Sequence, residues 1–516
     1  MPNLDRRAVV GAGLSLIAAP ALAQSATRGR LRLQANDALG TIPADYCGFS
    51  VETVQLADPD FFHPANASLI ALCRRLSPQG VLRIGGNSSE FCWWKATPDT
   101  PQPDLHAAGV GLADNHMPQH FTPIAPQAAD NLRGFLDACG WSCIWGLDLG
   151  TGAPERGAEE AAYVAKALGP RLRFFQIGNE PDLYRTPSNR LRPPTWGVDD
   201  YVGEWVATAK AVLAQVPGAR FGGPDVGGAV DWVAGFARQV PAQLGPALVS
   251  LTGHYYAEGP PTSPEADIPH LLAGDPSMLA RVDAIMAAAR ASGLPFRVTE
   301  ANSCYRGGKP GVSDVLAAAL WGADYMLQLA VRGGQGVCFH GGPGHGVALS
   351  NGDATPGARS AADMAEVQLG ALYSPFAGSR ALGFSARPLF YGMMLVQALT
   401  GGRLLDARLD AGGADATAFA VRVQDGWRVA VINKDAQRDL SLSIDLGQGA
   451  ALRHAHLWRL TGPALDARQG VRLAGAEVAA GDAAWAPRKT ERLMAPGDDL
   501  RVMVPKGSAA LLRVAG

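Results

Sequence analysis

The stretch of sequence that decides the fold is FFQIGNEP, residues 174–181. Its apolar first half is typical of a short buried strand, and Gly178 and Pro181 end regular structure directly after it. Asn179 and Glu180 therefore follow the carboxyl end of a strand, which is where parallel α/β folds place their chemistry. A glutamate beside an asparagine suits glycoside cleavage, because the acid protonates a leaving oxygen while the amide holds a neighbouring sugar hydroxyl.

Glycoside cleavage needs a second carboxylic acid across the scissile bond. The segment RVTEAN, residues 297–302, supplies one, because Glu300 ends another short apolar strand. The 120-residue interval from Glu180 to Glu300 has room for three strand–helix units. If the chain forms a barrel, the two glutamates lie on its fourth and seventh strands and face each other across its mouth.

Strand-like and helix-like segments alternate through the first 400 residues. This alternation predicts an α/β protein, a (β/α)8 TIM barrel over residues 41–400. The predicted strands are 46–52, 81–84, 143–148, 172–177, 220–225, 248–256, 297–300 and 337–340. The predicted helices include 68–76, 128–138, 158–168, 199–215, 278–292, 315–330 and 388–399.

Four segments together resemble one family: RIGGN at 83–87, GNEP at 178–181, HYY at 254–256 and EANSCYRGG at 300–308. They are similar to the large clan of retaining (β/α)8 glycosidases. Within it, they resemble the glycoside hydrolase family that contains heparanase and bacterial β-glucuronidases. The similarity covers most of residues 28–516.

A change of pattern marks the second domain. After Gly401-Gly402 the apolar residues alternate with polar ones, which is typical of an antiparallel β-sandwich. The resembled family has such a domain, and its N-terminal strand contributes to it. We therefore expect residues 28–40 and 401–516 to form a C-terminal β-sandwich domain.

The resemblance implies that Glu180 is the acid/base and Glu300 the nucleophile. A retaining reaction needs the two carboxyl groups about 5–5.5 Å apart. The negative charge of Glu300 would raise the pKa of Glu180, so that Glu180 holds a proton to donate.

The resemblance also implies which residues hold the sugar. Glu52, Asn87 and Asn179 match family positions that bind sugar hydroxyls. Tyr255 would donate a hydrogen bond to the nucleophile. Tyr256 is its competitor, because adjacent strand residues face opposite ways and only one of the two can do this.

The group on C6 of the sugar would be recognised by the loop after Glu300. Tyr305 offers a hydroxyl, and the amide of Gly307 can approach a carboxylate closely. One departure concerns a family tyrosine after the eighth strand, because residues 339–347 contain none. His340, His345 or Arg306 could substitute for it, or the site could prefer a sugar other than glucuronate.

Composition limits the partners. The formal charge is −2, from 45 basic and 47 acidic residues, and no basic block predicts binding to nucleic acid or to a heavily sulfated glycan. The seven cysteines lack the spacing of a zinc site and are expected to be small buried residues.

The N-terminus has the pattern of an export signal over residues 1–23. Arg6-Arg7 precede an apolar run, 8–19, and Ala21-Leu22-Ala23 resembles a cleavage site. The paired arginines allow a twin-arginine signal, and an ordinary secretory signal fits as well. The apolar run is too short for a membrane anchor, so we expect a periplasmic or secreted protein.

Together these features predict an exported retaining β-glycosidase, first of all a β-glucuronidase, acting on glycosides or oligosaccharides that can contain uronates. The two-carboxylate reaction needs no metal and no organic cofactor. Within enzymes, the alternatives are another β-glycosidase of the clan with altered C6 specificity, or a heparanase-like endo-β-glucuronidase. The non-enzyme alternative is a carbohydrate-binding protein on a glycosidase scaffold.

Overall fold

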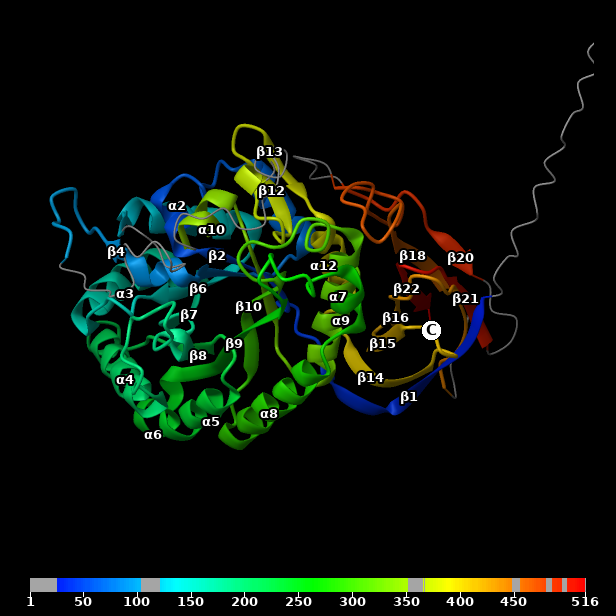
Figure 1. Ribbon diagram of the computed structural model, residues 1–516, viewed down its shortest axis with the longest axis horizontal. Coiled ribbons are helices and arrows are strands. Elements are labelled where there is room, and N and C mark those ends of the chain that lie inside the picture. Colours follow the sequence, from blue (N-terminus) through cyan, green and yellow to red (C-terminus); the bar gives the residue numbers. More distant parts are fainter. Residues whose placement is uncertain are drawn as a thin grey trace, which may run out of the picture.

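The computed structural model describes residues 26–103, 121–350, 365, 367–447, 455–478, 485–493 and 499–515. The predicted export signal, residues 1–23, lies outside the described residues. Figure 1 shows two parts side by side: a barrel surrounded by helices, and a smaller curled sheet. The predicted fold class, a TIM barrel followed by a sandwich-like domain, is confirmed.

Eight parallel strands close the barrel in chain order, so that the last pairs with the first. The strands are β2 (Cys47–Glu52), β3 (Val81–Gly85), β6 (Ser142–Leu147), β7 (Leu172–Ile177), β8 (Phe221–Val226), β9 (Leu248–Glu258), β10 (Phe296–Cys304) and β11 (Val337–Gly341). They are buried on both faces, as parallel strands under helices are, which explains their continuous apolar runs.

Helices surround the barrel (Figure 1). In chain order they are α1 (Ala67–Leu76), α2 (Pro126–Cys139), α3 (Pro154–Leu168), α4 (Val198–Gln215), α5 (Val230–Gln239), α6 (Pro241–Leu244), α7 (Ile268–Ala273), α8 (Pro276–Ser292), α9 (Leu316–Val331) and α12 (Pro388–Gln397). Helix α10 (Gly344–Ser350) lies in the connection after β11. Among the described residues, no helix is both long and apolar enough to cross a bilayer.

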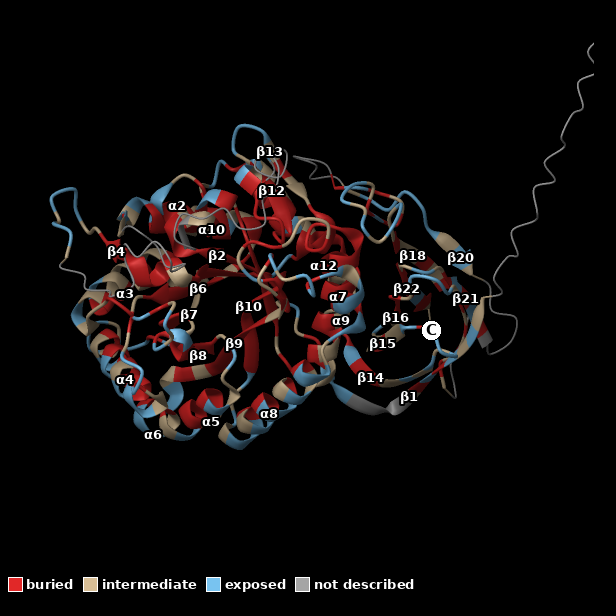
Figure 2. Cartoon of the chain, in the orientation of Figure 1, coloured by how far each residue is buried: buried red, intermediate tan, exposed pale blue. Residues whose placement is uncertain are grey.

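The local sequence explains where these helices start and stop. Helix α2 begins with Pro126, whose missing N–H costs nothing in the first turn, and it ends at Gly140 in the left-handed region. Trp141 then packs against Phe49 of β2 with ring centroids 5.1 Å apart and is fully buried, donating its indole N–H to the Ser77 carbonyl at 2.8 Å. Figure 2 shows the result, with buried residues on the strands and on the inner faces of the helices.

The second domain is one continuous ten-stranded sheet that curls over its own apolar core. Nine strands pair in the order β19 (Arg472–Leu473), β18 (Ala455–Thr461), β22 (Ser508–Ala515), β16 (Gly426–Asn433), β15 (Ala416–Val423), β14 (Arg403–Asp410), β1 (Thr27–Thr41), β17 (Leu440–Asp445) and β21 (Asp499–Val504). Strand β20 (Glu491–Leu493) pairs with β18. All strand pairs of this sheet are antiparallel except the pair of β1 with β17, which is parallel.

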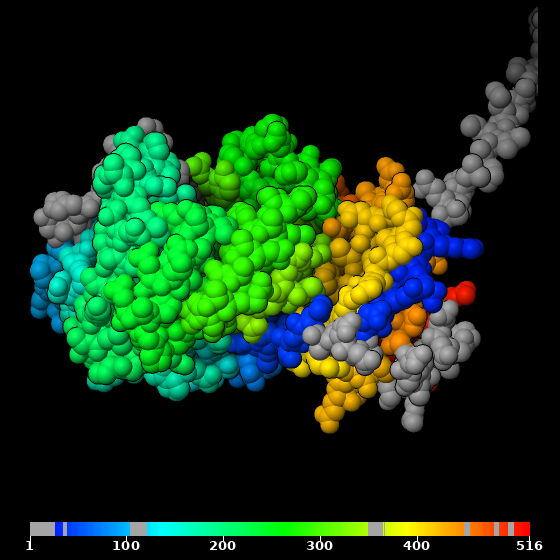
Figure 3. Space-filling model, turned by 90° about the horizontal axis from the view of Figure 1, so that it is seen from below, coloured from blue at the N-terminus to red at the C-terminus, as the bar shows by residue number. Residues whose placement is uncertain are grey.

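The N-terminal strand β1 joins this sheet, as Figure 3 shows by the blue strand against the yellow segments. The two parts of the molecule are also joined by polar contacts. Asp324 on α9 accepts a hydrogen bond from Thr417 at 2.8 Å and pairs with the nearly buried Lys434 at 3.0 Å. The sheet thus contacts the barrel through helix α9 and leaves the carboxyl ends of the barrel strands available for a functional site.

Candidate active site

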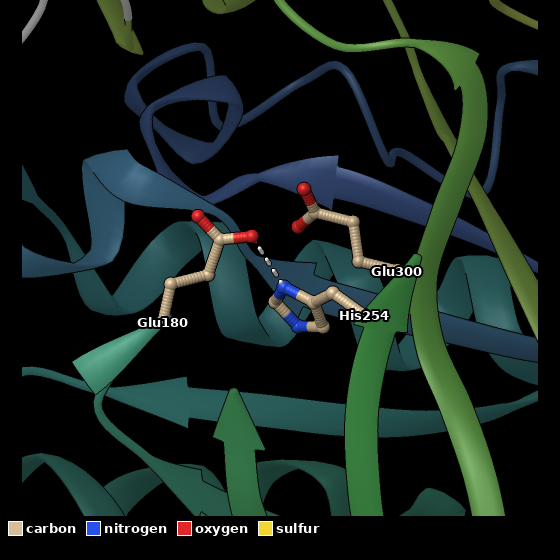
Figure 4. Close-up of side chains that lie close together, drawn as sticks. All are labelled: Glu180, His254 and Glu300. Atoms are coloured by element: carbon tan, nitrogen blue, oxygen red, sulfur yellow. Dashed lines mark hydrogen bonds and ion pairs between the residues drawn. The ribbon is translucent and has the colours of Figure 1, made fainter. Parts of the chain in front are cut away.

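Two glutamates meet at the carboxyl ends of the barrel strands. Glu180 follows β7, and Glu300 lies within β10. One oxygen of each, together with one nitrogen of His254, lie within 4.8 Å of one another (Figure 4). Glu180 is the more accessible, with 15% of its side chain exposed against 7% for Glu300.

The backbone of Glu180 is fixed in an uncommon conformation. Its φ of 48° lies in the left-handed region, which few residues other than glycine adopt. Its N–H donates to the Asp225 carbonyl at 3.0 Å, so the next strand holds the turn in place. A residue kept in such a conformation at a strand end is typical of functional sites.

His254, on β9, lies between the two glutamates (Figure 4). Its Nδ1 is 3.0 Å from Glu180, and its Nε2 is 3.1 Å from Asp225. Burial alone would lower the pKa of His254, but the charges of Asp225 and Glu300 raise it to about 10. His254 is therefore an imidazolium that donates to Glu180 through Nδ1.

Glu300 is held ionised. Burial raises its pKa, but the charges of His340, His254 and Arg83 and a hydrogen bond from Tyr256 lower it to about 2. Arg83 donates to one oxygen at 2.6 Å and the Tyr256 hydroxyl to the other at 2.7 Å. The carboxylate is thus fixed in direction and charge, which suits a nucleophile.

Glu180 has the opposite bias. Burial raises its pKa above the usual value, and the negative charge of Glu300 adds to the effect. The hydrogen bond and charge of His254 act against this rise without cancelling it. Two carboxyl groups whose environments push their pKa values apart are the usual mark of an acid paired with a nucleophile.

A buried charge network lies beneath both glutamates. Arg83, 1% exposed, donates to Glu300, to the Asn179 amide oxygen at 2.7 Å and to Asp225 at 2.5 Å. Asp225 also accepts from Gln176 and Thr299, and the charges of His254 and Arg83 hold its pKa well below the usual range despite burial. Asp225 is thus the shared counter-charge of the two cations that touch the glutamates.

The structure corrects the prediction for Tyr255. The hydroxyl that reaches Glu300 belongs to Tyr256, whereas Tyr255 stacks on Tyr325 of α9 with ring centroids 4.9 Å apart. The reason is strand alternation: His254 faces the site, so the residue two positions later shares its face and Tyr255 points to the helices.

Glu52, Asn87 and Asn179 all lie at this end of the barrel. Asn179 donates its amide N–H to the Asn87 oxygen at 3.1 Å. Glu52 is buried and accepts from the Ser88 hydroxyl at 2.6 Å and from the His340 ring at 3.2 Å. The fold thus brings these three predicted sugar-binding residues close to Glu180 and Glu300.

A glycine makes room for Glu52. Gly86 has a φ of +75°, and a Cβ there would lie 2.3 Å from a Glu52 oxygen. Any other side chain would displace the carboxylate, so the GG pair at 85–86 serves the site directly.

The predicted C6 loop is partly at the site. The Tyr305 ring, 36% exposed, meets the Tyr256 ring edge to face with centroids 6.3 Å apart. Gly307 has a φ of +88°, and its carbonyl accepts from the Tyr373 N–H at 3.3 Å. Arg306 lies over the outer Tyr305 ring at 5.9 Å.

Tyr373 was missed by sequence reasoning. It belongs to the same connection after β11 that lacks a tyrosine in 339–347, but it comes much later in the chain. Its ring packs 6.2 Å from that of Tyr256 and 5.9 Å from that of His340. A search of the whole connection up to α12, rather than of its first residues, would have found it.

Glu90 was missed as well. It is 1% exposed and accepts backbone N–H groups from Asn179 at 2.7 Å, Leu149 at 3.0 Å and Gly150 at 2.5 Å. One carboxylate from the segment η2 (Asn87–Phe91) thereby fixes the ends of two neighbouring strands. Nothing in the local sequence distinguishes it from a surface glutamate.

The spacing of Glu180, His254 and Glu300 would also permit a metal ion. Their atoms already have partners: His254 donates to Glu180, while Arg83 and Tyr256 occupy the two Glu300 oxygens. Two buried cations, from His254 and Arg83, supply the positive charge that a metal would bring. Ion pairing among the side chains therefore accounts for the cluster.

All seven cysteines are buried and unpaired, as expected for small core residues. Burial raises the pKa of Cys304, the one near the nucleophile loop, to about 12. A thiol with so high a pKa is not a nucleophile at neutral pH.

A closed (β/α)8 barrel with two facing carboxyl groups at the carboxyl ends of its strands is one architecture on which glycosides are hydrolysed. Solved structures agree on the fold. A 4-O-α-L-rhamnosyl-β-D-glucuronidase from Fusarium oxysporum, in complex with Rha-GlcA, is similar with a TM-score of 0.69 and 18% identity over 94% of this chain and 99% of that one. An arabinofuranosidase from Xanthomonas axonopodis pv. citri is similar with a TM-score of 0.62 and 14% identity, over 95% of this chain and 99% of that one.

Sequence comparison is more specific. The chain is similar to the β-glucuronidase of Aspergillus niger, with 24% identity over 57% of this chain and 58% of that protein. It is also similar to the β-glucuronidase of Neurospora crassa, with 26% identity over 50% of this chain and 49% of that protein. The chain spans about half the length of the curated relatives it matches. No family model matches it.

Proposed function

We propose that this protein is a retaining β-glucuronidase. The observation that carries the proposal is the pair Glu180 and Glu300, with oxygens within 4.8 Å and oppositely biased pKa values. A retaining reaction needs carboxyl groups about 5–5.5 Å apart, whereas an inverting one needs about 6.5–9.5 Å to admit a water. The similarity to fungal β-glucuronidases favours a glucuronosyl substrate.

In the first step the ionised Glu300 attacks the anomeric carbon while Glu180 gives its proton to the leaving oxygen. The glycosidic bond breaks, and a glycosyl ester forms on Glu300. The charge of Glu300 is then gone, which lowers the pKa of Glu180 and makes it a base toward water. In the second step water loses a proton to Glu180, attacks the same carbon and releases Glu300.

The sugar hydroxyls would be held by Glu52, Asn87 and Asn179. The carboxylate on C6 would lie toward the loop containing Tyr305 and Gly307. Tyr373 packs against Tyr256 beside this region and would take the place of the tyrosine that residues 339–347 lack.

A panel of nitrophenyl glycosides tests the proposal. The β-glucuronide should be the best substrate, and the panel should include the α-L-arabinofuranoside because arabinofuranosidases share the fold. NMR of fresh hydrolysate should show the β anomer of glucuronic acid as first product. Hydrolysis of another glycoside in preference, release of the α anomer, or sugar binding without turnover would each overturn the proposal.

We also propose export through the signal over residues 1–23. The mature chain should then begin near Gln24, which N-terminal sequencing of periplasmic or secreted protein decides. An intact Met1 on exported protein would contradict the assignment.

A further inference from the structure

A pocket lies at the amino end of the barrel, away from the two glutamates. Its volume is about 480 Å³. Most of its lining residues lie at or near the start of a barrel strand; they include Asp45, Ser142, Leu172, Arg220, Val249 and Gln335. Glu180 and Glu300 lie at the opposite, carboxyl ends, and a strand of five or six residues spans about 17–20 Å. A ligand in this pocket would therefore be separate from a sugar bound at the glutamates.

The lining of this pocket carries a net positive charge. Three arginines, Arg173, Arg220 and Arg297, line it together with a single carboxylate, Asp45. Asp45 pairs with Arg173 and, at 3.4 Å, with Arg297. The exposed Arg220 side chain has no hydrogen bond or ion pair within the described residues. Three cations against one anion leave two positive charges without a counter-charge.

The arginines influence one another, as expected when such charges lie close together. Burial and the charge of Arg297 lower the pKa of Arg173, and the charge of Asp45 acts against this fall. Arg173 still has 36% of its side chain exposed, so it can be reached from solvent. An anion entering the pocket would relieve this repulsion.

Arg297 is the buried member of the three, with 2% of its surface exposed. Its Nη2 donates to the Gln335 carbonyl at 2.8 Å and to the Asp45 carbonyl at 3.1 Å. Its Nη1 has no hydrogen-bond partner of ordinary geometry in the part of the chain that the structure describes. The Cys338 thiol lies near this guanidinium but is a weak acceptor. A buried cation that shares its one carboxylate with Arg173 is costly, and a bound anion would lower that cost.

The charge and the shape of the pocket select the ligand. Guanidinium groups bind the oxygens of phosphates and carboxylates in pairs. A phosphate monoester carries a charge of about −1.5 to −2 at pH 7, which matches the two uncompensated positive charges. A sulfate ester or a single carboxylate carries only one negative charge and would leave one arginine without a partner. Leu172, Phe174 and Val249 give the pocket an apolar part that a bare phosphate ion would not cover.

We propose that this pocket binds a small organic phosphate, with Arg173, Arg220 and Arg297 around the phosphate group and the organic part against Phe174 and Val249. The site is additional to the proposed glycosidase site and does not depend on it. Because the ligand would contact the ends of several barrel strands, its binding should stabilise the folded protein.

Titration calorimetry with three probes tests the ligand class. The titrations use a chloride buffer of constant ionic strength at about pH 7.5, where a phosphate monoester is close to a dianion. Phenyl phosphate should bind at least about tenfold more tightly than phenyl sulfate, which has the same ring and one charge less, and several-fold more tightly than inorganic phosphate. Equal affinity for the two phenyl esters, or no binding of phenyl phosphate, would overturn the site. Equal affinity for phenyl phosphate and inorganic phosphate would overturn the organic part of the proposal.

Variants locate the binding. Arg220→Gln should weaken the affinity for phenyl phosphate at least about fivefold, and the fold should be kept because this side chain is exposed. Arg501→Gln, at an exposed arginine on β21 of the second domain, is the matched control and should leave the affinity unchanged. Asp45→Asn removes the carboxylate that competes with the ligand and should tighten binding. Unchanged affinity in Arg220→Gln, or weaker binding in a folded Asp45→Asn protein, would refute the assignment.

A variant at the other end of the barrel separates the two sites. Glu300→Gln removes a negative charge at the carboxyl ends of the strands, so an anion bound there would bind more tightly to this variant. The affinity for phenyl phosphate should instead equal that of the wild type. Tighter binding in Glu300→Gln would place the phosphate beside the glutamates and overturn the proposal.

Discussion

Replacing Tyr256 with Phe removes one oxygen atom and the hydrogen bond to Glu300 at 2.7 Å. A hydrogen bond to a charged group contributes about 1.5–3 kcal/mol, and about 1.4 kcal/mol corresponds to a tenfold change in rate. The second Glu300 oxygen still accepts the hydrogen bond from Arg83 at 2.6 Å, so the Glu300 carboxylate should stay in place but lose one of its two hydrogen bonds. We therefore expect kcat/KM to fall about 10–150-fold.

The pH profile gives the second readout. Glu300 must be ionised to attack, so activity is lost as the pH falls through its pKa. The hydroxyl of Tyr256 helps to lower that pKa, and its removal should move the acidic limb of kcat/KM to higher pH. The matched control is Tyr255→Phe, because Tyr255 precedes Tyr256 on β9 but packs against Tyr325. Equal losses in the two variants, or less than a twofold loss in Tyr256→Phe, would refute the reasoning.

Three further predictions concern the carboxyl groups and their partners. Glu300→Gln should abolish activity on every glucuronide. Glu180→Gln should still be glycosylated by an activated aryl glucuronide, and added azide should restore its turnover by forming a β-glycosyl azide; the reverse pattern would exchange the roles of the two residues. Chelation with EDTA should leave kcat unchanged, because His254 and the arginine beneath the site already supply the positive charge; loss of activity restored by a divalent cation would contradict this. Asp225→Asn should destabilise the protein by about 3 kcal/mol at pH 6, since it leaves buried cations without their partner. The raised pKa of His254 contributes stability that is complete below about pH 6.5 and lost as the pH rises toward about 10. Because Asp225 is the main cause of that raised pKa, thermal unfolding should show a smaller difference between variant and wild type at pH 10 than at pH 6; a constant difference would refute the linkage.

The barrel could be predicted from the sequence because its signals are local. Continuous apolar runs ending in polar residues marked the strands, and 3.6-residue periodicity marked the helices between them. The positions of Glu180 and Glu300 followed from the same signals, since each lies at the end of a predicted strand. Period-two alternation likewise revealed the second domain, although it did not show that one continuous sheet forms it.

The choice between Tyr255 and Tyr256 needed the rotation of β9 about its axis. A period of two tells which residues share a face but not which face points inward. Had His254 been placed at the site first, Tyr256 would have followed from it. The place of Asp225 at the end of the predicted strand 220–225 followed from the sequence, but its contacts did not, because an irregularity in the register of β8 with β9, between Pro224 and Val226, accompanies its positive φ of 61°. Such irregularities depend on neighbouring strands and have no local signature.

Asp225 couples the two halves of the proposed reaction. Arg83 and His254 both help His340 to keep Glu300 ionised, His254 also touches Glu180, and Arg83 and His254 share this one buried carboxylate. If Asp225 were neutral, the pKa of His254 would fall, because Asp225 is the largest influence that keeps His254 protonated. The pKa of Glu180 would then rise, because the positive charge of His254 beside it would be lost. Arg83, freed from one partner, would still pair with Glu300. A single substitution at Asp225 should therefore shift both limbs of the pH profile to higher pH: the basic limb, set by the acid Glu180, and the acidic limb, set by Glu300, because the charge of His254 lowers the pKa of both carboxyl groups.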